Sequence, residues 1–211
     1  MENYTGAKNK HGELIISITN KLAKVGRPSS IYKVPKKLVK LKEDAYTPSI
    51  VSIGPFHHKN KELLAFEEHK RRYMLHLFMR MSESAQSTLE ECATVILGLE
   101  GEVRRCYSEY IEFDAQEVAE ILLVDGCFIL ELFLRYSHNK NYEEEKKVHE
   151  TVLTLQHDLA LLENQIPFAV LQILFDVIKM KMPQPHSFSE QNMVTLALNF
   201  FKSAEFEQPS N

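Results

Sequence analysis

The chain has 211 residues, of which 44% are apolar and 26% charged, with a net charge of −4 and an isoelectric point near 6.2. This composition is typical of a globular protein with a sizeable core, which argues against disorder over most of the chain. It also argues against a nucleic-acid partner, because no basic excess is present to neutralise phosphates.

The three cysteines, Cys92, Cys106 and Cys127, do not form the even, dense set of a disulfide framework, and they suit a reducing compartment. The polar first ten residues lack the apolar stretch of a signal peptide. No run of about eighteen apolar residues occurs. The sequence as given therefore predicts a cytoplasmic protein.

Apolar spacing, scarce glycine and the absence of tryptophan favour an all-α or mainly α, multi-helix globular domain. We expect a flexible tail over residues 1–12, a helical domain over 13–206 and a frayed end over 207–211. The spacing and the end signals predict helices over 14–25, 62–81, 84–99, 115–136, 148–163, 168–180 and 189–206. Residues 103–113 have mixed spacing, and 137–147 form a solvated connection or helix start.

Two short extended segments precede most of these helices. Residues 31–35 and 50–53 are rich in β-branched side chains and are predicted to be strands or extended loops. Pro35 and Pro48 limit their length, because proline cannot donate a hydrogen bond to a neighbouring strand.

Two patterns support individual helices. Within 62–81, an apolar stripe predicts a surface helix, and Glu67 stands three and four residues before Lys70 and Arg71, a spacing that stabilises a helix surface. Asp114 followed by Glu117 predicts a capping box at the start of the helix over 115–136.

Asp125 and Gly126 lie inside an otherwise apolar helix, beside Cys127. A carboxylate in such a place needs a partner, so Asp125 is expected to pair with a lysine, an arginine or a helix N-terminus. The alternative role is that of a catalytic acid. Gly126 is expected to allow close approach of another backbone, and Cys127 to be a small buried group.

Glu163, Asn164 and Gln165 precede Pro167, in similarly apolar company. Proline either kinks the helix here or starts the next one. The three polar side chains are expected to satisfy the backbone groups that this break leaves free.

The one cluster with chemical potential is His57 and His58, which follow Gly54 and Pro55. Adjacent histidines could bind a metal or transfer protons. In an extended segment their side chains point to opposite sides, however, so the structural interpretation is a turn set by Gly54 and Pro55, with one histidine hydrogen-bonded to the backbone.

Common signatures of enzymes and metal sites are missing from the sequence. No glycine-rich phosphate loop, G-x-S-x-G motif, paired Glu-x-x-His motif or C-x-x-C motif occurs. His149 and Glu150 begin like a zinc-protease helix, but Leu153 stands where the second histidine is required. We therefore assign no catalytic, cofactor or metal-binding residues and expect no enzyme.

Several motifs in fixed order resemble one plant family, catalogued as domain of unknown function 247. The resemblance spans about residues 31–176. The segments that carry it are Ile31–Pro35, Ala45–Pro48, Val51–His58, Phe66–Tyr73, Leu123–Glu131 and Asp158–Phe168.

The resemblance implies a land-plant source, a mainly helical fold and no established enzymatic activity. Members of that family are about twice as long and end in a transmembrane helix, so a fragment of a longer member would belong to the plasma membrane, held by an anchor beyond this sequence. Some members are implicated in pollen–stigma self-incompatibility, which implies recognition or signalling.

Two hypotheses follow. The first is a non-enzymatic interaction or recognition module with an unknown protein partner, and with possible self-association through uncovered apolar faces at 168–180 and 194–201. The second is an enzyme or metal-binding protein that uses His57 or His58 with Asp125 or Glu163. Under the first, the motif residues are structural: Pro35, Gly54, Pro55, His57, His58, Glu67, Lys70, Asp125, Gly126, Glu163, Asn164, Gln165 and Pro167.

Overall fold

The computed structural model describes residues 4–23, 29–81, 84–138, 146–182 and 192–202. Within these ranges the backbone forms eight α-helices, two short 3-10 helices and one isolated β-bridge. The prediction of a mainly α fold is confirmed. The elements are α1 (Tyr4–Ala23), α2 (Lys36–Val39), η1 (Glu43–Ala45), η2 (Leu64–Phe66), α3 (Glu67–Met79), α4 (Ala85–Arg104), α5 (Ala115–His138), α6 (Lys146–Ala160), α7 (Phe168–Lys181) and α8 (Met193–Lys202).

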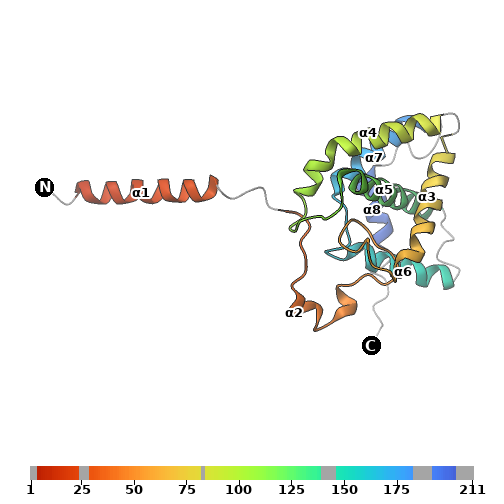
Figure 1. Cartoon of the computed structure of the whole chain (residues 1–211), viewed down its shortest axis with the longest axis horizontal. Helices are drawn as coiled ribbons and strands as arrows, with labels where there is room; N and C mark the ends of the chain where they lie inside the picture. Colours follow the sequence, from red (N-terminus) through yellow and green to blue (C-terminus); the bar gives the residue numbers. More distant parts are fainter. Residues whose placement is uncertain (1–3, 24–28, 82–83, 139–145, 183–191, 203–211) are drawn as a thin grey trace.

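Helix α5 lies at the centre of the helical body and packs against α3, α4, α7 and α8 (Figure 1). All residues from 125 to 134 are buried, because this part of α5 is apolar around most of its circumference. The predicted capping box is confirmed at its start. The Glu117 N–H donates to Asp114 Oδ1 at 2.8 Å, and the Asp114 N–H donates to Glu117 Oε2 at 2.9 Å.

The predicted helix over 62–81 is divided in two, because η2 ends at Phe66 and α3 begins at Glu67. The prediction of a surface helix is wrong at Lys70, whose side chain is completely buried. Helix α4 runs beyond its predicted end to Arg104. Arg104 then donates to the carbonyl oxygens of Ile111 and Phe113, which holds the following non-helical segment against the helix.

Residues 29–35 and 46–56 cross the helical body mainly as irregular chain rather than as strands. A single parallel bridge joins Ile31 to Tyr107, so of the two predicted possibilities the extended loop is correct. At the end of the second segment Gly54 has φ of +72°, in the left-handed region that favours glycine, as the predicted turn requires. An added Cβ would also overlap the carbonyl oxygen of Gln165.

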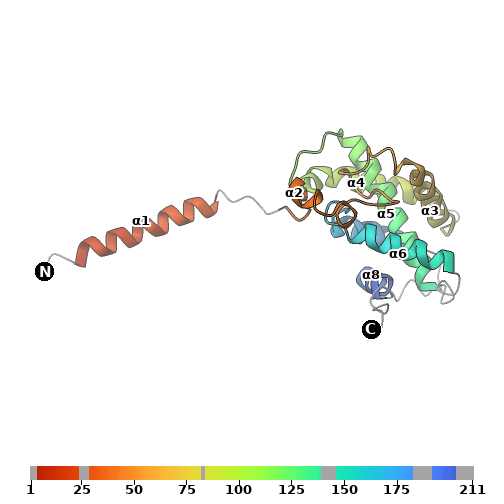
Figure 2. The same cartoon turned by 90° about the horizontal axis from the view of Figure 1, so that it is seen from below.

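Helix α1 extends farther toward the N-terminus than the helix predicted over 14–25. The helix begins at Tyr4 rather than at Leu14, because no proline or glycine pair interrupts the residues before Leu14. Figures 1 and 2 show α1 standing apart from the other helices. The exposed apolar side chains Leu14, Ile15, Ile16 and Ile18 therefore have no helix packed on them.

The C-terminal helices lie close to their predicted positions. Helix α6 begins at Lys146 and ends at Ala160, whereas α7 has Pro167 as its N-terminal flanking residue, so the proline starts a helix rather than kinking one. Residues 139–145, 189–191 and 203–211, which include the predicted connection, both ends of the predicted last helix and the frayed C-terminus, lie outside the described residues. Across the described ranges, no helix is both long and apolar enough to cross a membrane.

Candidate functional site

Six buried polar residues from four parts of the chain form a layer beneath the extended segment 46–56. We call this set the polar seam: Glu67, Lys70, Asp125, Asp158, Glu163 and Asn164. Five of the six were singled out in the sequence as motif positions. All of them except Glu67 form hydrogen bonds with backbone groups that no helix or sheet satisfies.

The centre of the seam is the ammonium group of Lys70. Lys70 Nζ lies 2.5 Å from Asp125 Oδ1, 2.6 Å from Glu67 Oε1 and 2.9 Å from the carbonyl oxygen of Ser52. Asp125 Oδ2 accepts a hydrogen bond of 2.8 Å from the Gly54 N–H. The basic partner that the sequence predicts for Asp125 is thus Lys70, and together they hold both sides of the Ser52–Gly54 turn.

Burial dominates the titration of this carboxyl. Complete burial raises the pKa of Asp125 above its ordinary value, although the Lys70 ammonium and the Gly54 N–H oppose that shift. Glu67 Oε1 is close to Lys70, but the angle does not make a hydrogen bond, so this oxygen is held by charge alone.

Asp158 and Asn164 satisfy the rest of the segment. Asp158 accepts hydrogen bonds of 2.8–3.0 Å from the N–H groups of Ser49, Ile50 and Val51. Asn164 accepts from the Ile53 N–H at 2.7 Å and donates to the carbonyl oxygens of Val51 and Asp158. These two side chains therefore replace the neighbouring strand that this segment lacks.

Glu163 reaches the first extended segment. Its Oε1 accepts a hydrogen bond of 2.6 Å from the Val34 N–H, and its Oε2 lies 3.6 Å from His57 Nε2. The role expected for Glu163, Asn164 and Gln165 is therefore only partly correct. Asn164 does satisfy a carbonyl at the end of α6, but most of these bonds reach segments more than a hundred residues earlier in the chain.

The two adjacent histidines face different neighbours. His57 lies beside Glu163, whereas His58 contacts Phe113 edge-to-face, with ring centroids 5.5 Å apart. Among the described residues neither ring forms the expected hydrogen bond to the backbone, and His57 Nε2 and His58 Nδ1 are both buried without a hydrogen-bond partner. Burial lowers the pKa of His57, with Glu163 and Asp158 opposing the shift and Lys33 adding to it.

The remaining motif residues act through packing and through backbone contacts. At Gly126 the close neighbour is the side chain of Leu174 on α7, where a backbone had been expected. Cys127 is fully buried, and that burial raises the pKa of its thiol. The carbonyl oxygen of Gln165 accepts a hydrogen bond of 3.0 Å from Tyr107 Oη.

The three motif prolines stand at segment ends: Pro35 before α2, Pro55 after Gly54, and Pro167 before α7.

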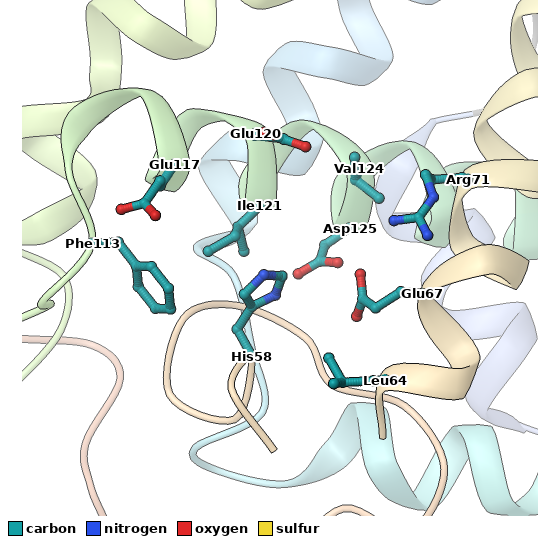
Figure 3. Close-up of a pocket in the computed structure, with 10 residues that line it drawn as sticks. All are labelled: His58, Leu64, Glu67, Arg71, Phe113, Glu117, Glu120, Ile121, Val124 and Asp125. Atoms are coloured by element: carbon teal, nitrogen blue, oxygen red, sulfur yellow. The ribbon is translucent and has the colours of Figure 1, made fainter. Parts of the chain in front are cut away.

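A cavity of about 450 Å³ lies above the seam, between the loop that carries His58, the start of α3 and the first half of α5 (Figure 3). The picture shows the His58 ring and the carboxylates of Glu67 and Asp125 turned toward one another. Apolar walls complete the cavity. Its lining comprises His58, Leu64, Glu67, Arg71, Phe113, Glu117, Glu120, Ile121, Val124 and Asp125.

A second hollow has a different character. It is a groove of about 310 Å³ between α5, α7 and α8, and most of its lining is apolar. We call it the apolar groove: Ser30, Ile31, Ile53, Ile129, Phe133, Leu159, Asn164, Gln165, Ile166, Pro167, Phe168, Leu171, Met193, Ala197 and Phe201. Of the faces expected to be uncovered, most of α7 is buried, but Phe168, Met180, Val194 and Leu198 are about half exposed or more.

Sequence reasoning missed Asp158 as a functional position, although it lay within a quoted motif. The available signal was its place three residues after the buried Leu155, on the apolar side of α6. It also missed the cavity residues Arg71 and Glu120, since nothing local in the sequence indicates that α3 and α5 lie side by side. In the part of the chain that the structure describes, no three histidine, cysteine or acidic side chains are grouped as metal ligands would be.

Comparisons with known proteins give one family. The model of a family described as a plant protein of unknown function, domain of unknown function 247, matches residues 31–211. The chain is 33% identical over 205 residues to the Arabidopsis thaliana UPF0481 protein At3g47200, and 34% identical over 145 residues to the putative UPF0481 protein At3g02645 of the same plant. These alignments cover 95% and 68% of this chain, but only 40% and 26% of the two relatives. No solved structure matches.

Proposed function

Since the chain belongs to the plant family catalogued as domain of unknown function 247, whose description assigns no activity, we propose a function from its surfaces: a non-enzymatic interaction module that binds an amphipathic helix in its apolar groove. The observation that carries the proposal is the groove itself, an open apolar hollow with helices on three sides. An amphipathic helix laid in such a groove is a common mode of recognition, because it buries apolar area on both partners.

The acidic groups of the seam support a non-enzymatic role. Asp125 uses both oxygens on Lys70 and Gly54, and Asp158 accepts from three successive amides. A general acid or base must be able to exchange a proton with a substrate. Groups so fully engaged in holding the backbone are poorly suited to that task.

The helix that we assign to the groove is α1 of a second copy. Helix α1 presents exposed Leu14, Ile15 and Ile18 on one side, and residues 30 and 31, a few positions after α1 ends, line the groove. The net charges of α1 and of the rest of the chain are opposite in sign. Helix α1 has three lysines and one glutamate, a net charge of +2, so the rest of this −4 chain has −6. Because each copy offers one helix and one groove, reciprocal docking closes a dimer.

The first experiment measures mass by light scattering on a size-exclusion column over a range of concentrations. We expect wild type to approach twice 24.4 kDa as concentration rises. Ile18→Glu on α1 and Ala197→Glu in the groove should each remain monomeric. Ile16→Glu, on the opposite side of α1 from Leu14, Ile15 and Ile18, is the matched control and should associate as wild type does.

Mixing the two defective variants sharpens the test. The Ile18→Glu chain keeps an intact groove and the Ala197→Glu chain keeps an intact α1, so the mixture should form a one-sided heterodimer. The chain has no tryptophan, so Ile15→Trp supplies a single fluorescent reporter. If the Ile15→Trp variant is a monomer at all concentrations and its indole emission is already that of a buried ring, the proposal is overturned in favour of α1 folding onto its own chain.

A further inference from the structure

A short stretch that contains α2 forms a surface separate from the polar seam and from the apolar groove. The sequence over 36–42 is Lys-Lys-Leu-Val-Lys-Leu-Lys, with four lysines and no acidic residue. We call residues 36–42 the basic turn. Six of its seven residues are exposed, and none of those in α2 is buried. Figure 1 shows α2 at the edge of the molecule, away from the helices gathered around α5.

The backbone of the basic turn places its leucines in one row. The Leu41 N–H donates to the Leu38 carbonyl oxygen at 3.0 Å, and the Lys42 N–H donates to the Val39 carbonyl oxygen at 3.2 Å. Residues three apart in such a tight helical turn lie on the same side. Val39 is half-buried and marks the side that faces the protein, so the leucine row faces outward. Leu41 is 81% exposed and Leu38 is 43% exposed.

The lysines of the basic turn flank this row and keep their full charge. Lys37 and Lys40 are also three residues apart, so they form a second row beside the leucines. In the part of the chain that the structure describes, every lysine that forms an ion pair lies outside the basic turn. Glu43 and Asp44 begin η1 directly after the turn, which places the nearest acidic residues in the sequence at one end of it.

The combination of free ammonium groups and outward leucines suits a lipid surface of negative charge. Lysines close to such a surface gain electrostatic attraction, and apolar side chains beside them gain by entering the boundary between headgroups and acyl chains. A protruding turn can meet a flat bilayer without any change in the helices behind it. The net charge of the chain is −4, so only a basic face can approach such a bilayer favourably.

We propose that the basic turn binds an anionic lipid surface, with its four ammonium groups among the headgroups and the row of Leu38 and Leu41 inserted between them. An acidic segment of another protein is the competing partner. Such a segment would match the lysines, but a protruding turn gives it no groove to lie in.

The experiment is flotation of the whole chain with lipid vesicles. We expect the chain to float with vesicles of phosphatidylcholine that contain about 30% phosphatidylserine, and not with pure phosphatidylcholine vesicles. Raising NaCl from about 0.1 M to about 0.5 M should weaken binding at least about tenfold, because salt screens exposed charges. Equal flotation with both kinds of vesicle, or none with either, would overturn the proposal.

Two variants with matched controls locate the surface. Lys40→Glu replaces an attraction by a repulsion and should weaken vesicle binding about tenfold or more. Leu41→Ser should weaken it about fivefold or more, since it removes the most exposed leucine of the row. Lys61→Glu and Leu75→Ser make the same changes at exposed positions elsewhere, and each should alter binding less than about twofold. Similar losses in a variant and its control would exclude the basic turn.

A fluorescent reporter shows whether the leucine row enters the lipid. The chain has no tryptophan, so Leu41→Trp supplies a single indole, whose emission should move to shorter wavelength with phosphatidylserine vesicles. Leu75→Trp on α3 should not respond. A response of Ile16→Trp without one of Leu41→Trp would place the lipid contact on α1 and overturn the proposal. So would a response of Leu41→Trp to a decaglutamate peptide but not to vesicles, which would identify an acidic protein segment as the partner.

Discussion

The polar seam and the apolar groove share a wall at Ile53 and Asn164, yet they are built on opposite principles. In the seam, charged and amide side chains from three helices and the α6–α7 connection supply directed bonds to one irregular segment. In the groove, apolar side chains of α5, α7 and α8 surround an open hollow. Directed bonds fix one position of the backbone, whereas apolar contact is non-directional and can accept another surface. We therefore expect the seam to hold the backbone in one conformation and the groove to bind another apolar surface.

The largest expected difference between the two regions is the response to losing one side chain. Asp125→Ala leaves the Lys70 ammonium buried without its closest partner and the Gly54 N–H unsatisfied, so we expect a loss of about 3–5 kcal/mol in the free energy of unfolding. Leu198→Ala, on the exposed side of α8, should cost less than about 0.5 kcal/mol. Urea unfolding measures both.

A second substitution separates buried charge from general damage. Adding Lys70→Met to Asp125→Ala removes the unpaired ammonium and should recover part of the lost stability. If Asp125→Ala costs no more than Leu198→Ala, the seam does not hold the fold as described.

Gly54 gives the next effect, because the seam fixes the backbone on either side of it. Gly54→Ala meets both a positive φ and the Gln165 carbonyl, so we expect a loss of about 2 kcal/mol or more. Gly98→Ala is the control: nothing lies near its added Cβ, and it should stabilise α4 by about 0.5–1 kcal/mol. Thermal melting of the two variants should shift in opposite directions, and a shared direction would contradict the tight turn.

The smallest effect is a dependence on pH from His57, which lies beside the seam residue Glu163. Burial lowers the pKa of His57 in the folded chain below its ordinary value of 6.5. At a pH between the folded and the ordinary pKa, the ring is therefore protonated in the unfolded chain but neutral in the folded chain. The stability contributed by neutral His57 is therefore present above pH 6.5 and is lost as the pH falls below it. Glu163, Asp158 and Lys33 are the charged groups that act on the ring.

The measurement compares unfolding free energies at pH 7.5 and pH 5.5. Wild type should lose up to about 1 kcal/mol more than His57→Gln over that interval. His11→Gln, in the exposed helix α1, serves as the control and should follow wild type. An identical pH response of wild type and His57→Gln would show that burial does not depress this titration.

Local patterns predicted the helices well where the deciding interactions were also local. The capping box at Asp114 and Glu117, the start of α7 after Pro167 and the length of α5 all depend on residues within a few positions of one another. The predictions that were wrong concern residues whose partners lie far away in the chain. The pattern placed Lys70 on a surface, because its spacing from Glu67 suits an exposed ion pair, but its closest partner is Asp125 on another helix.

The sequence by itself determined the helical class, the positions of most helices, the family and the set of polar residues that must find partners. Periodicity and composition carry that information, because burial and capping act over one or two turns. Only the tertiary structure decided which partners they find: Glu163 with Val34, Asp158 with Ser49–Val51, and Asp125 with Lys70 and Gly54. It also decided where the groove and the cavity open. Those contacts join segments far apart in the chain, and their geometry depends on how all the helices around α5 pack at once.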